Sequence, residues 1–507
     1  MIPLPATDWC AKWALYAPGK MAFREHETGR ALTYARLNRA ADALAWHLTQ
    51  QWGLKKGDRV AVLADLCLEY VALFGAAQKT GIVLVPLNYR LTAPEIDFML
   101  KNAAPKAVLV EPKYRHLLEG AAFSNKIPHR SDLAVVSGFM GVELSDMEGS
   151  PFPAVALREK DPVFILYTSG TTGFPKGALY THQMLFWNSI NTAMSLVINT
   201  ESRALNFAPP FHTGCWNVLA TPFLHHGGYT CILKKFDPAA VLELLQQERC
   251  TILFGVPTML RMLADEPGFA SAAFPALQYA IVGGEPMPLP LIEQWHAKGV
   301  LIRQGYGMTE VGPNLTSLHQ DNAMRKRGSI GRPNFYVDIR IVDADGADCP
   351  PGQPGELLLR GPMVTPGYWR NPSATEKAFA PGGWFRTGDL VRQDEDAYLY
   401  VVDRIKNMFI SGGENVYPVE VERVLLGHEA VAEAAVVGIP DEKWGEVGRA
   451  FVVKKTGVVL EAPALLDFCR SQLAAYKVPK SVVFLDALPK NDAGKINRMG
   501  LKGWGVV

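Results

Sequence analysis

The chain has 507 residues, of which 51 are lysine or arginine and 50 are aspartate or glutamate, so its formal net charge is +1. This length predicts about two to four domains, and 48% hydrophobic with 20% charged residues is typical of a soluble globular protein. The balanced charge and the lack of a lysine- or arginine-rich tract argue against a nucleic-acid-binding surface. No apolar run approaches the ~20 residues of a membrane span.

The N-terminus and the cysteines indicate the compartment. Residues 1–9 lack a basic region followed by an apolar one, so we expect no secretory signal. The seven cysteines (10, 67, 215, 231, 250, 349 and 469) are scattered without a Cys-x-x-Cys pair, which is typical of free thiols in a reducing compartment and argues against a zinc site. We therefore expect a cytoplasmic enzyme.

From about residue 30 to 310, strand-like apolar runs alternate with helix-like segments. We expect strands at 58–63, 81–86, 107–110, 163–166, 230–233, 251–254 and 279–282, and helices at 69–78 and 93–101. This alternation predicts a mostly parallel sheet with helices on its faces. Such sheets bind ligands at the carboxyl ends of their strands, which is where 283–285 and 304–310 lie.

The segment 168–178, directly after the expected strand 163–166, is the most informative in the chain. It contains four hydroxyl side chains, three glycines and one lysine. Hydroxyls donate hydrogen bonds, glycines let the backbone approach a ligand closely, and the lysine neutralises charge, so the segment predicts a loop that binds a polyphosphate. It is not a Walker A loop, because Lys176 follows a proline and precedes a glycine.

The composition changes after about residue 327. Short runs at 339–342 and 355–359 predict a small β-rich subdomain over about 328–402, and later strands at 435–437 and 450–453 with helices at 420–426 and 464–473 predict an α+β region. The fold class expected is thus a large N-terminal α/β domain over 1–402, with mostly parallel sheets, and a smaller α+β C-terminal domain over 408–507. We place the boundary at 403–407.

Six motifs together carry a family resemblance. They are Thr168-Ser-Gly-Thr-Thr-Gly-Phe-Pro-Lys-Gly177, Tyr306-Gly-Met-Thr-Glu310, Gly383-Trp-Phe-Arg-Thr-Gly-Asp389, Asp403-Arg-Ile-Lys406, Ser411-Gly-Gly-Glu-Asn-Val-Tyr-Pro-Val-Glu420 and Pro489-Lys-Asn-Asp-Ala-Gly-Lys-Ile-Asn-Arg498. In this order, over residues ~30–500, the chain resembles the adenylate-forming superfamily, and within it the acyl-CoA synthetases.

The resemblance implies a reaction in two half-steps. A carboxylate attacks the α-phosphate of ATP to give an acyl-adenylate and pyrophosphate, and the thiol of coenzyme A then displaces AMP to leave a thioester. ATP, Mg²⁺ and coenzyme A are the implied cofactors, and a small carboxylic acid is the implied substrate. Activation is needed because a free carboxylate has no usable leaving group, whereas an adenylate has AMP.

The resemblance also assigns residues to the nucleotide and the metal. Glu310 and Thr168 would coordinate Mg²⁺, Thr309 would bond the α-phosphate, Tyr306 would stack on adenine, and Asp389 with Arg404 would hold the ribose. A purely core role for Tyr306 and a local turn role for Asp389 are the simpler alternatives. The full nucleotide-binding set implied is Thr168, Ser169, Gly170, Thr171, Thr172, Gly173, Lys176, Gly283, Gly284, Glu285, Gln304, Gly305, Tyr306, Gly307, Asp389 and Arg404.

The C-terminal motifs imply a mobile domain. Lys495 would be the catalytic lysine that bridges the two anionic reactants, an electrostatic contact typically worth ~2–4 kcal/mol, and Lys406 would be the hinge around which the domain rotates between the half-reactions. For coenzyme A the implied residues are Ser411, Gly412, Gly413, Trp444, Tyr476 and Lys480, the last three with ordinary packing or surface roles as alternatives. Ile410 departs from the relatives that carry lysine at this position.

The acid pocket is less well defined. The motif 209–216 matches the segment that begins this pocket, so we expect His212 to guard the carboxylate entrance and Trp216 to act as a gate, with a core tryptophan as the alternative. Further lining is expected from Gly255, Val256, Thr258, Gly305 and Met308. Because no arginine or lysine belongs to this set, dicarboxylates and amino acids are disfavoured.

Three readings of function stay open. The first is a ligase for medium- or long-chain fatty acids, with a benzoate- or cinnamate-type aryl ligase close behind. The second is an adenylating enzyme that loads a carrier protein. The third is a binding protein without catalysis, which the presence of Lys495, Glu310 and Asp389 disfavours. A monomer or a homodimer is expected.

Overall fold

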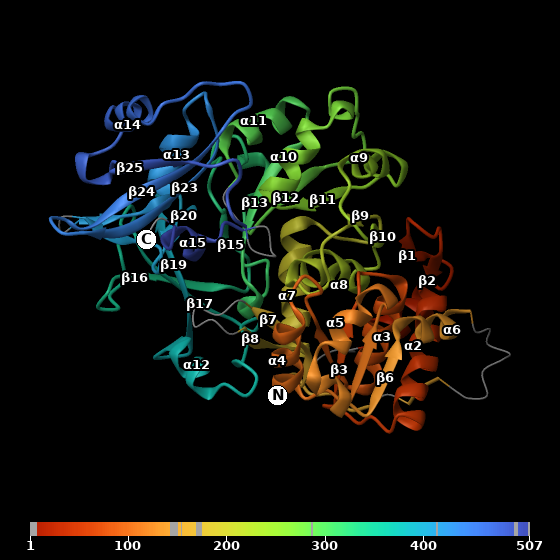
Figure 1. The fold of residues 1–507 in the computed structure, drawn as a ribbon. Helices are drawn as coiled ribbons and strands as arrows, with labels where there is room; N and C mark the ends of the chain where they lie inside the picture. The colour runs from red at the N-terminus through yellow and green to blue at the C-terminus, as the bar shows by residue number, and fades with distance from the viewer. Residues whose placement is uncertain are drawn as a thin grey trace.

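The structure is a computed structural model that describes residues 8–141, 151–153, 155–168, 175–284, 287–411, 414–490 and 495–504. In these residues the strands form four sheets, two of them in the N-terminal part (Figure 1). The helices are α1 (Trp9–Tyr16), α2 (Tyr34–Trp46), α3 (Leu68–Thr80), α4 (Ala93–Ala103), α5 (Arg115–Glu119), α6 (Ser137–Met140), α7 (His182–Leu196), α8 (Thr221–His225), α9 (Pro238–Gln247), α10 (Pro257–Asp265), α11 (Leu289–Ala297), α12 (Pro372–Lys377), α13 (Pro418–Leu426), α14 (Ala462–Arg470) and α15 (Arg498–Lys502).

The first sheet has the strand order β6-β5-β3-β4-β7-β8. Its strands are β3 (Arg59–Leu63), β4 (Val83–Pro86), β5 (Ala107–Val110), β6 (His129–Asp132), β7 (Pro162–Thr168) and β8 (Lys176–Thr181). All neighbours pair in parallel except β7 and β8, which are antiparallel. The inner strands β3, β4, β5 and β7 are mostly apolar because helices cover both faces, whereas the edge strand β6 is polar and partly exposed. The covering helix α3 is buried at every residue.

The second sheet has the strand order β15-β14-β13-β12-β11-β9-β10-β1-β2. It contains β1 (Met21–Glu25), β2 (Ala31–Thr33), β9 (Arg203–Asn206), β10 (Tyr229–Ile232), β11 (Ile252–Gly255), β12 (Tyr279–Val282), β13 (Leu301–Tyr306), β14 (Thr316–Ser317) and β15 (Arg332–Pro333). The pairs from β1 to β13 are parallel, and the outer strands are antiparallel. The predicted parallel architecture is thus confirmed, as two sheets rather than one.

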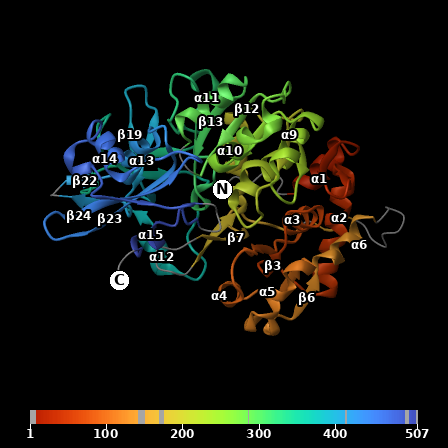
Figure 2. The same ribbon diagram turned by 45° about the horizontal axis from the view of Figure 1, so that its top comes forward.

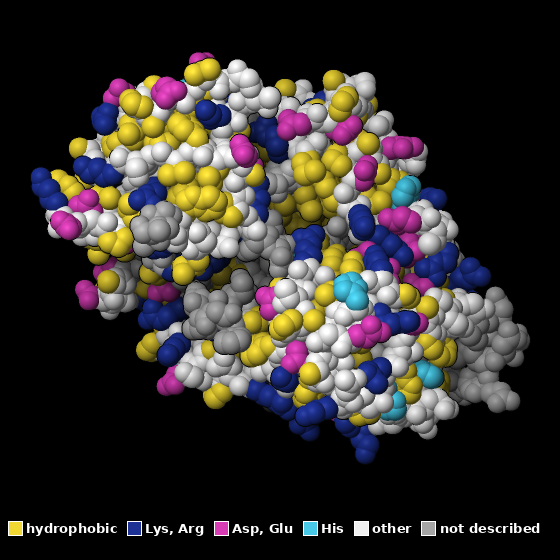
Figure 3. All heavy atoms as spheres, in the orientation of Figure 1, with side chains coloured by type: hydrophobic (Ala, Val, Ile, Leu, Met, Phe, Trp, Pro, Cys, Tyr) yellow, Lys and Arg dark blue, Asp and Glu magenta, His cyan; other side chains and the backbone are white. Residues whose placement is uncertain are grey.

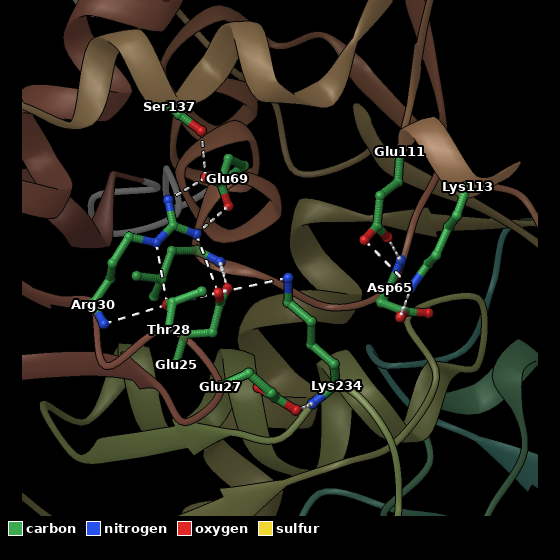
Figure 4. A network of polar contacts seen from close by, with 11 residues as sticks. Glu25, Glu27, Thr28, Arg30, Asp65, Glu69, Glu111, Lys113, Ser137 and Lys234 are labelled. Carbon is green, nitrogen blue, oxygen red and sulfur yellow. Dashed lines mark hydrogen bonds and ion pairs between the residues drawn. The ribbon is translucent and has the colours of Figure 1, made fainter. Parts of the chain in front are cut away.

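A buried ionic network joins these two sheets (Figure 4). Arg30, beside β2, donates to both carboxylate oxygens of Glu69 in α3, at 2.5 and 3.1 Å, and to fully buried Glu25 at 3.2 Å. Ser137 also donates to Glu69 at 2.6 Å. Burial would raise the pKa of Glu69, but the hydrogen bonds from Arg30 and Ser137 lower it to about 2. The network therefore fixes how the two sheets meet.

The C-terminal half contains the other two sheets. A β-rich sheet comprises β16 (Asp338–Val342), β17 (Gly355–Arg360), β18 (Phe379–Ala380), β19 (Trp384–Gln393) and β20 (Leu399–Arg404), all antiparallel. The last sheet comprises β21 (Phe409–Ser411), β22 (Glu414–Val416), β23 (Val431–Asp441), β24 (Gly445–Lys454) and β25 (Ser481–Phe484), with only β25 parallel to its neighbour. Both ribbon views place these C-terminal elements and the first sheet on opposite sides of the molecule (Figures 1 and 2).

Some predicted boundaries need correction. Residues 176–178, expected in the phosphate loop, belong to β8, because Lys176 pairs with Thr168 across the β7–β8 hairpin. The expected helix 464–473 ends at Arg470. The β-rich sheet extends to Arg404 at the end of β20, where Arg404 pairs with Asp389 of β19. Among the described helices none has the length and apolarity to cross a membrane.

Candidate active site

The first part of the site is the predicted magnesium pair. Thr168 ends β7, and Glu310 lies in the one-turn 3-10 helix Thr309–Val311 that follows β13. Although these residues are 142 positions apart, the Thr168 hydroxyl donates to Oε1 of Glu310 at 3.2 Å. Both side chains offer hard oxygen ligands of the kind Mg²⁺ takes. The described residues contain no group of three or more His, Cys, Asp or Glu side chains that could hold a metal ion, so phosphate oxygens would have to complete the coordination.

Tyr368 is the residue at this position that the sequence reasoning missed. Its hydroxyl donates to the same Oε1 of Glu310 at 3.0 Å, and its ring lies 5.4 Å from the ammonium of Lys176 at the start of β8. The only sequence signal was its place in Pro366-Gly-Tyr-Trp369, between the expected strand 355–359 and the Asp389 motif. Lys176, Thr168 and Glu310 are thus brought together as predicted, with Tyr368 between them.

Part of the predicted nucleotide site lies outside the described residues. These positions are Ser169, Gly170, Thr171, Thr172, Gly173 and Glu285, together with Gly412 and Gly413 of the predicted coenzyme A set.

The second part of the site is a carboxylate held from two sides. Asp389 in β19 is 3% exposed, and its Oδ2 accepts a hydrogen bond from the hydroxyl of Tyr306 at 2.6 Å. Its Oδ1 pairs with Nε of Arg404 at 2.9 Å. Burial and the charge of Asp389 raise the pKa of Tyr306 well above its usual value, so the phenol remains a donor. The three predicted residues come from three strands and meet at one point.

Glycines let the backbone turn sharply beside this carboxylate. Gly284, after β12, has φ of +90°, a left-handed conformation that favours glycine. A Cβ on Gly307 would lie 2.2 Å from the carbonyl oxygen of Pro313, so only glycine fits there. Gln304 is 4% exposed, and its amide is already bonded to the backbone of Met287 and Ser329, so its side chain holds loops together. Gly283 and Gly305 approach each other across β12 and β13, with a Gly283 Cβ at 3.5 Å from the Gly305 oxygen.

The third part of the site surrounds His212. The Nε2 atom of His212 is buried and has no hydrogen-bond partner among the described residues. Burial, followed by the charges of Arg90 and Lys495, lowers its pKa to about 4, so the imidazole is neutral near pH 7. The charge of Lys495, predicted as the catalytic lysine, therefore acts on His212 although Lys495 lies near the C-terminus of the chain.

Arg90 corrects one expectation about this pocket. The sequence predicted no arginine or lysine in this pocket for a second carboxylate, but Arg90, in the loop after β4, acts on His212 and lies 5.7 Å from the ring of Phe211. A loop residue more than a hundred positions away in sequence gave no signal for this contact. The expected exclusion of dicarboxylates therefore loses its basis.

Trp216 lies in the hydrophobic core rather than at a pocket mouth. It is 1% exposed, its indole donates to the Pro210 carbonyl at 2.9 Å, and its ring packs against Tyr70, Phe74 and Phe164 at 5.0 to 5.6 Å. The structure favours the core alternative for this residue. Phe254, which the sequence reasoning did not single out, instead approaches the backbone next to His212, since a Cβ on Gly214 would lie 3.2 Å from its ring.

The remaining predicted pocket residues lie near the ends of β11 and β13. Gly255 ends β11, Val256 caps α10, Thr258 lies in the first turn of α10, and Met308 and Thr309 follow β13, all except Gly255 being half-buried. Val256 lies beside Gly284, because a Cβ on Gly284 would lie 3.6 Å from its side chain. A residue predicted for the acid pocket is therefore a neighbour of one predicted for adenine.

The segment after His212 forms a π-helix, Cys215–Ala220, a form often found at functional sites. The carbonyl of Asn217 in it accepts hydrogen bonds from buried Asn188 in α7 at 2.7 Å and from buried Asn314 at 3.3 Å. Asn314 follows Glu310 by four residues, so these buried amides tie the acid-side segment to the metal-side segment.

The C-terminal residues divide into separate groups. Lys406 follows β20, and burial with the charge of Arg404 lowers its pKa, with a smaller contribution from Lys495. Ser411 is buried and pairs with Gly445, which places it beside Trp444 in the β23–β24 hairpin, and Lys480 lies 5.9 Å from the Trp444 ring. Tyr476 instead lines a cavity of about 540 Å³ between β19–β20 and the C-terminal domain, with Tyr400, Tyr417 and Glu420 among the other lining residues.

The positive charges near these residues favour the binding of a polyanion. Arg404 pairs with Asp389, and Lys176 lies 5.4 Å from the ring of Tyr368, which bonds Glu310. The charges of Arg90 and Lys495 act on His212. The space-filling view shows a hollow between the C-terminal part and the rest of the chain, with lysine and arginine side chains at its edge (Figure 3).

Comparisons with known proteins agree with this geometry. Residues 10–369 match the family model of the AMP-binding enzyme, and residues 420–495 match that of the AMP-binding enzyme C-terminal domain. A feruloyl-CoA synthase of Amycolatopsis sp is 40% identical over 96% of both chains, and the long-chain-fatty-acid–CoA ligase FadD13 of Mycobacterium tuberculosis is 37% identical over 96% of both. The crystal structure of ATP-bound MatB from Rhodopseudomonas palustris has a TM-score of 0.89 at 32% identity and covers 98% of both chains.

Proposed function

Because the chain belongs to the AMP-binding enzyme family, we propose that it joins an aryl-substituted carboxylic acid to coenzyme A. Its reaction class is that of an AMP-forming acyl-CoA synthetase, which uses ATP, Mg²⁺ and coenzyme A. The single observation that carries the choice of acid is the ring of Phe254 against Gly214, two residues after His212.

The chemistry balances in two steps. A carboxylate oxygen of the acid forms a bond to the α-phosphorus of ATP while the bond from that phosphorus to the bridging oxygen breaks, and pyrophosphate leaves. The sulfur of coenzyme A then forms a bond to the acyl carbon, the bond from this carbon to the AMP oxygen breaks, and the thiol proton goes to solvent.

On this proposal the first group of residues binds the nucleotide. Glu310 and Thr168 hold Mg²⁺, which when bound neutralises charge on the phosphate oxygens, and Lys176 contacts the same phosphates. Asp389 accepts the ribose hydroxyls because a carboxylate offers two acceptor oxygens, and Arg404 holds it in place. The stacking of Tyr306 on adenine is compatible with its bond to Asp389, since that bond uses only the hydroxyl.

The second group of residues promotes attack of the acid's carboxylate on the α-phosphate. Lys495 places a cation between the two anions that must meet, and Thr309 donates to the α-phosphate where charge develops. His212 is uncharged near neutral pH, so its ring borders the carboxylate without an ion pair that would hold the acid in its ground state. The proposal keeps the predicted hinge role of Lys406. It also keeps coenzyme A as the ligand of Ser411, Trp444, Tyr476 and Lys480.

Aromatic surfaces support an aryl acid. Phe254 and Phe211 flank the His212 segment, and the Phe211 ring meets the Tyr89 ring edge-on at 4.9 Å. Flat rings favour stacked or edge-on contacts with another ring. One of the sequence features that favoured a fatty acid was a gating role for Trp216, and this residue packs in the core. A medium- or long-chain fatty acid remains the alternative, because FadD13 is a relative of nearly equal identity.

The test is pyrophosphate release with ATP and Mg²⁺ across benzoate, cinnamate, ferulate, decanoate, palmitate and malonate, each with and without coenzyme A. We expect the highest kcat/KM on an aryl acid and turnover that depends on coenzyme A. A maximum on palmitate would overturn the aryl proposal in favour of the fatty-acid alternative, and release indifferent to coenzyme A would indicate a carrier protein as acceptor.

A single variant tests whether the preference for an aryl acid depends on the ring of Phe254. Gly214→Ala introduces a methyl group 3.2 Å from the Phe254 ring without backbone strain, because the φ of Gly214 is −58°. We expect it to lower kcat/KM for the preferred aryl acid about tenfold, as a misplaced ring loses contact, while acetate is affected less than threefold. An equal loss for every acid would show that Phe254 does not border the acid.

A further inference from the structure

The segment 365–369 connects β8, Glu310 and the end of α4. It runs alongside β8 as an added strand: Leu179 donates to the Gly367 carbonyl at 3.1 Å, and the backbone of Trp369 donates to the Gly177 carbonyl at 2.7 Å. Tyr368 pairs with Ala178 between these two bonds. A segment from the β-rich side of the chain is therefore bonded to the strand that begins with Lys176.

Both ends of this segment are fixed. Thr365 is 2% exposed, its backbone donates to the Glu310 carbonyl at 2.7 Å, and its hydroxyl donates to the Leu179 carbonyl at 2.7 Å. At the other end, the indole of Trp369 donates to the Asn102 carbonyl at 3.0 Å. The backbone of Glu310 and that of β8 are thus held by the same short segment.

Tyr368, in the middle of this segment, makes contacts through both its hydroxyl and its ring. Its hydroxyl donates to Oε1 of Glu310 at 3.0 Å, and Thr168 donates to the same oxygen at 3.2 Å. Two donors on Oε1 fix the rotation of the carboxylate, and no described residue is recorded as donating to Oε2. The Tyr368 ring lies 5.4 Å from the Lys176 ammonium, within the range of a cation–π contact.

We propose that Tyr368 is a positioning residue for the metal and the phosphates: its hydroxyl orients the Glu310 carboxylate toward Mg²⁺, and its ring supports Lys176. The inference rests on the proposed role of Glu310 as the magnesium ligand. Partners that orient a ligating carboxylate typically change metal affinity or activity by about 10- to 100-fold when removed.

The first test is Tyr368→Phe, which removes only the hydroxyl. We expect the Mg²⁺ concentration for half-maximal adenylation to rise about tenfold or more, with conversion of supplied acyl-AMP and coenzyme A to thioester unchanged. Tyr229→Phe is the matched control, because Tyr229 also donates to a carboxylate, that of Glu248 at 2.8 Å, but lies on β10 away from Glu310. The control should leave the Mg²⁺ dependence unchanged.

The second measurement does not use turnover. Calorimetric titration of Mg²⁺ into protein with a non-hydrolysable ATP analogue should show weaker Mg²⁺ binding in Tyr368→Phe by the same factor. Tyr368→Leu should in addition weaken binding of the analogue about two- to fivefold, because Lys176 also loses the ring. Unchanged Mg²⁺ affinity in folded Tyr368→Phe would overturn the proposal and leave the hydroxyl a purely structural role.

The two proposals fail differently. If the wild-type protein releases no pyrophosphate with any acid, the proposed function fails, while the calorimetric comparison still tests Tyr368. If the wild type is active and the variant keeps its Mg²⁺ dependence, only the positioning role fails. The melting temperature of each variant, measured alongside, identifies any that does not fold.

Discussion

Asp389→Asn is the sharpest test of the nucleotide site, because it removes a charge and leaves the shape almost unchanged. The wild-type carboxylate has two acceptor oxygens, one facing the Tyr306 hydroxyl at 2.6 Å and one facing Arg404 at 2.9 Å. An asparagine keeps one acceptor and turns a donor toward one of these donors. A ribose with two adjacent hydroxyls then finds one usable acceptor instead of two.

The magnitude follows from the hydrogen bonds. A bond to a charged group contributes about 1.5–3 kcal/mol and a neutral one about 0.5–1.5 kcal/mol. Losing one charged bond to ribose and reducing the other to a neutral bond costs about 2–4 kcal/mol, which corresponds to about 30- to 1,000-fold in the Kd for ATP. Arg404 is 47% exposed, so the broken ion pair itself contributes little to stability.

The assay measures, by calorimetry, the Kd for ATP and the Kd for 2′-deoxy-ATP in the wild type and in the variant. We expect the wild type to prefer ATP and Asp389→Asn to lose most of that preference, as in a double-mutant cycle between protein and ligand. A variant that binds ATP within threefold of wild type, or that still distinguishes the two nucleotides as strongly, would refute the assignment of Asp389 to the ribose.

Three further outcomes are expected. Lys495→Ala should lower adenylation by about 30- to 1,000-fold, the effect of losing a contact to developing charge worth about 2–4 kcal/mol, yet spare thioester formation from supplied acyl-AMP. Loss of both half-reactions in a folded variant would contradict the domain rotation. Burial lowers the pKa of His182 and of His212 to about 4, below the ordinary 6.5. The unfolded chain therefore binds these protons first, and the free energy of unfolding should fall as pH drops from 6.5 toward 4, by about 1.4 kcal/mol per histidine at pH 5.5. Urea unfolding of wild type and His182→Gln at pH 7.5 and 5.5 checks this, and equal pH dependence in both would argue against it. Gly307→Ala should lower the melting temperature strongly, because its Cβ would lie 2.2 Å from the Pro313 oxygen. In Gly346→Ala the Cβ meets nothing within 4 Å, so its melting temperature should fall only by the strain of a φ of +83°. Similar falls in the melting temperatures of the two variants would contradict the steric argument.

Features that depend on local sequence were predicted well. The strands 107–110 and 279–282 coincide with β5 and β12, because a short apolar run bounded by polar and glycine residues has few other stable conformations. That Thr168 lies with Glu310, and Asp389 with Arg404, was implied by the family resemblance rather than by local sequence.

Contacts between distant segments were not predictable in this way. Tyr368 reaches Glu310 across 58 residues, Arg90 reaches His212 from another loop, and Trp216 packs against Phe74 and Phe164 of the first sheet. Nothing local to these residues specifies their partners, since the partners depend on how two sheets and a β-rich region are placed against one another.

The sequence by itself determined the positions of several strands, the chemistry available at their carboxyl ends and the family, because turns and buried apolar runs depend on neighbouring residues. Only the tertiary structure decided which side chain faces which: that Lys176 starts a strand, that a tyrosine stands between it and Glu310, and that a tryptophan expected at a pocket mouth fills the core. The physical reason is that side-chain packing depends on how two surfaces fit together. Each surface is formed by residues that are far apart in the chain.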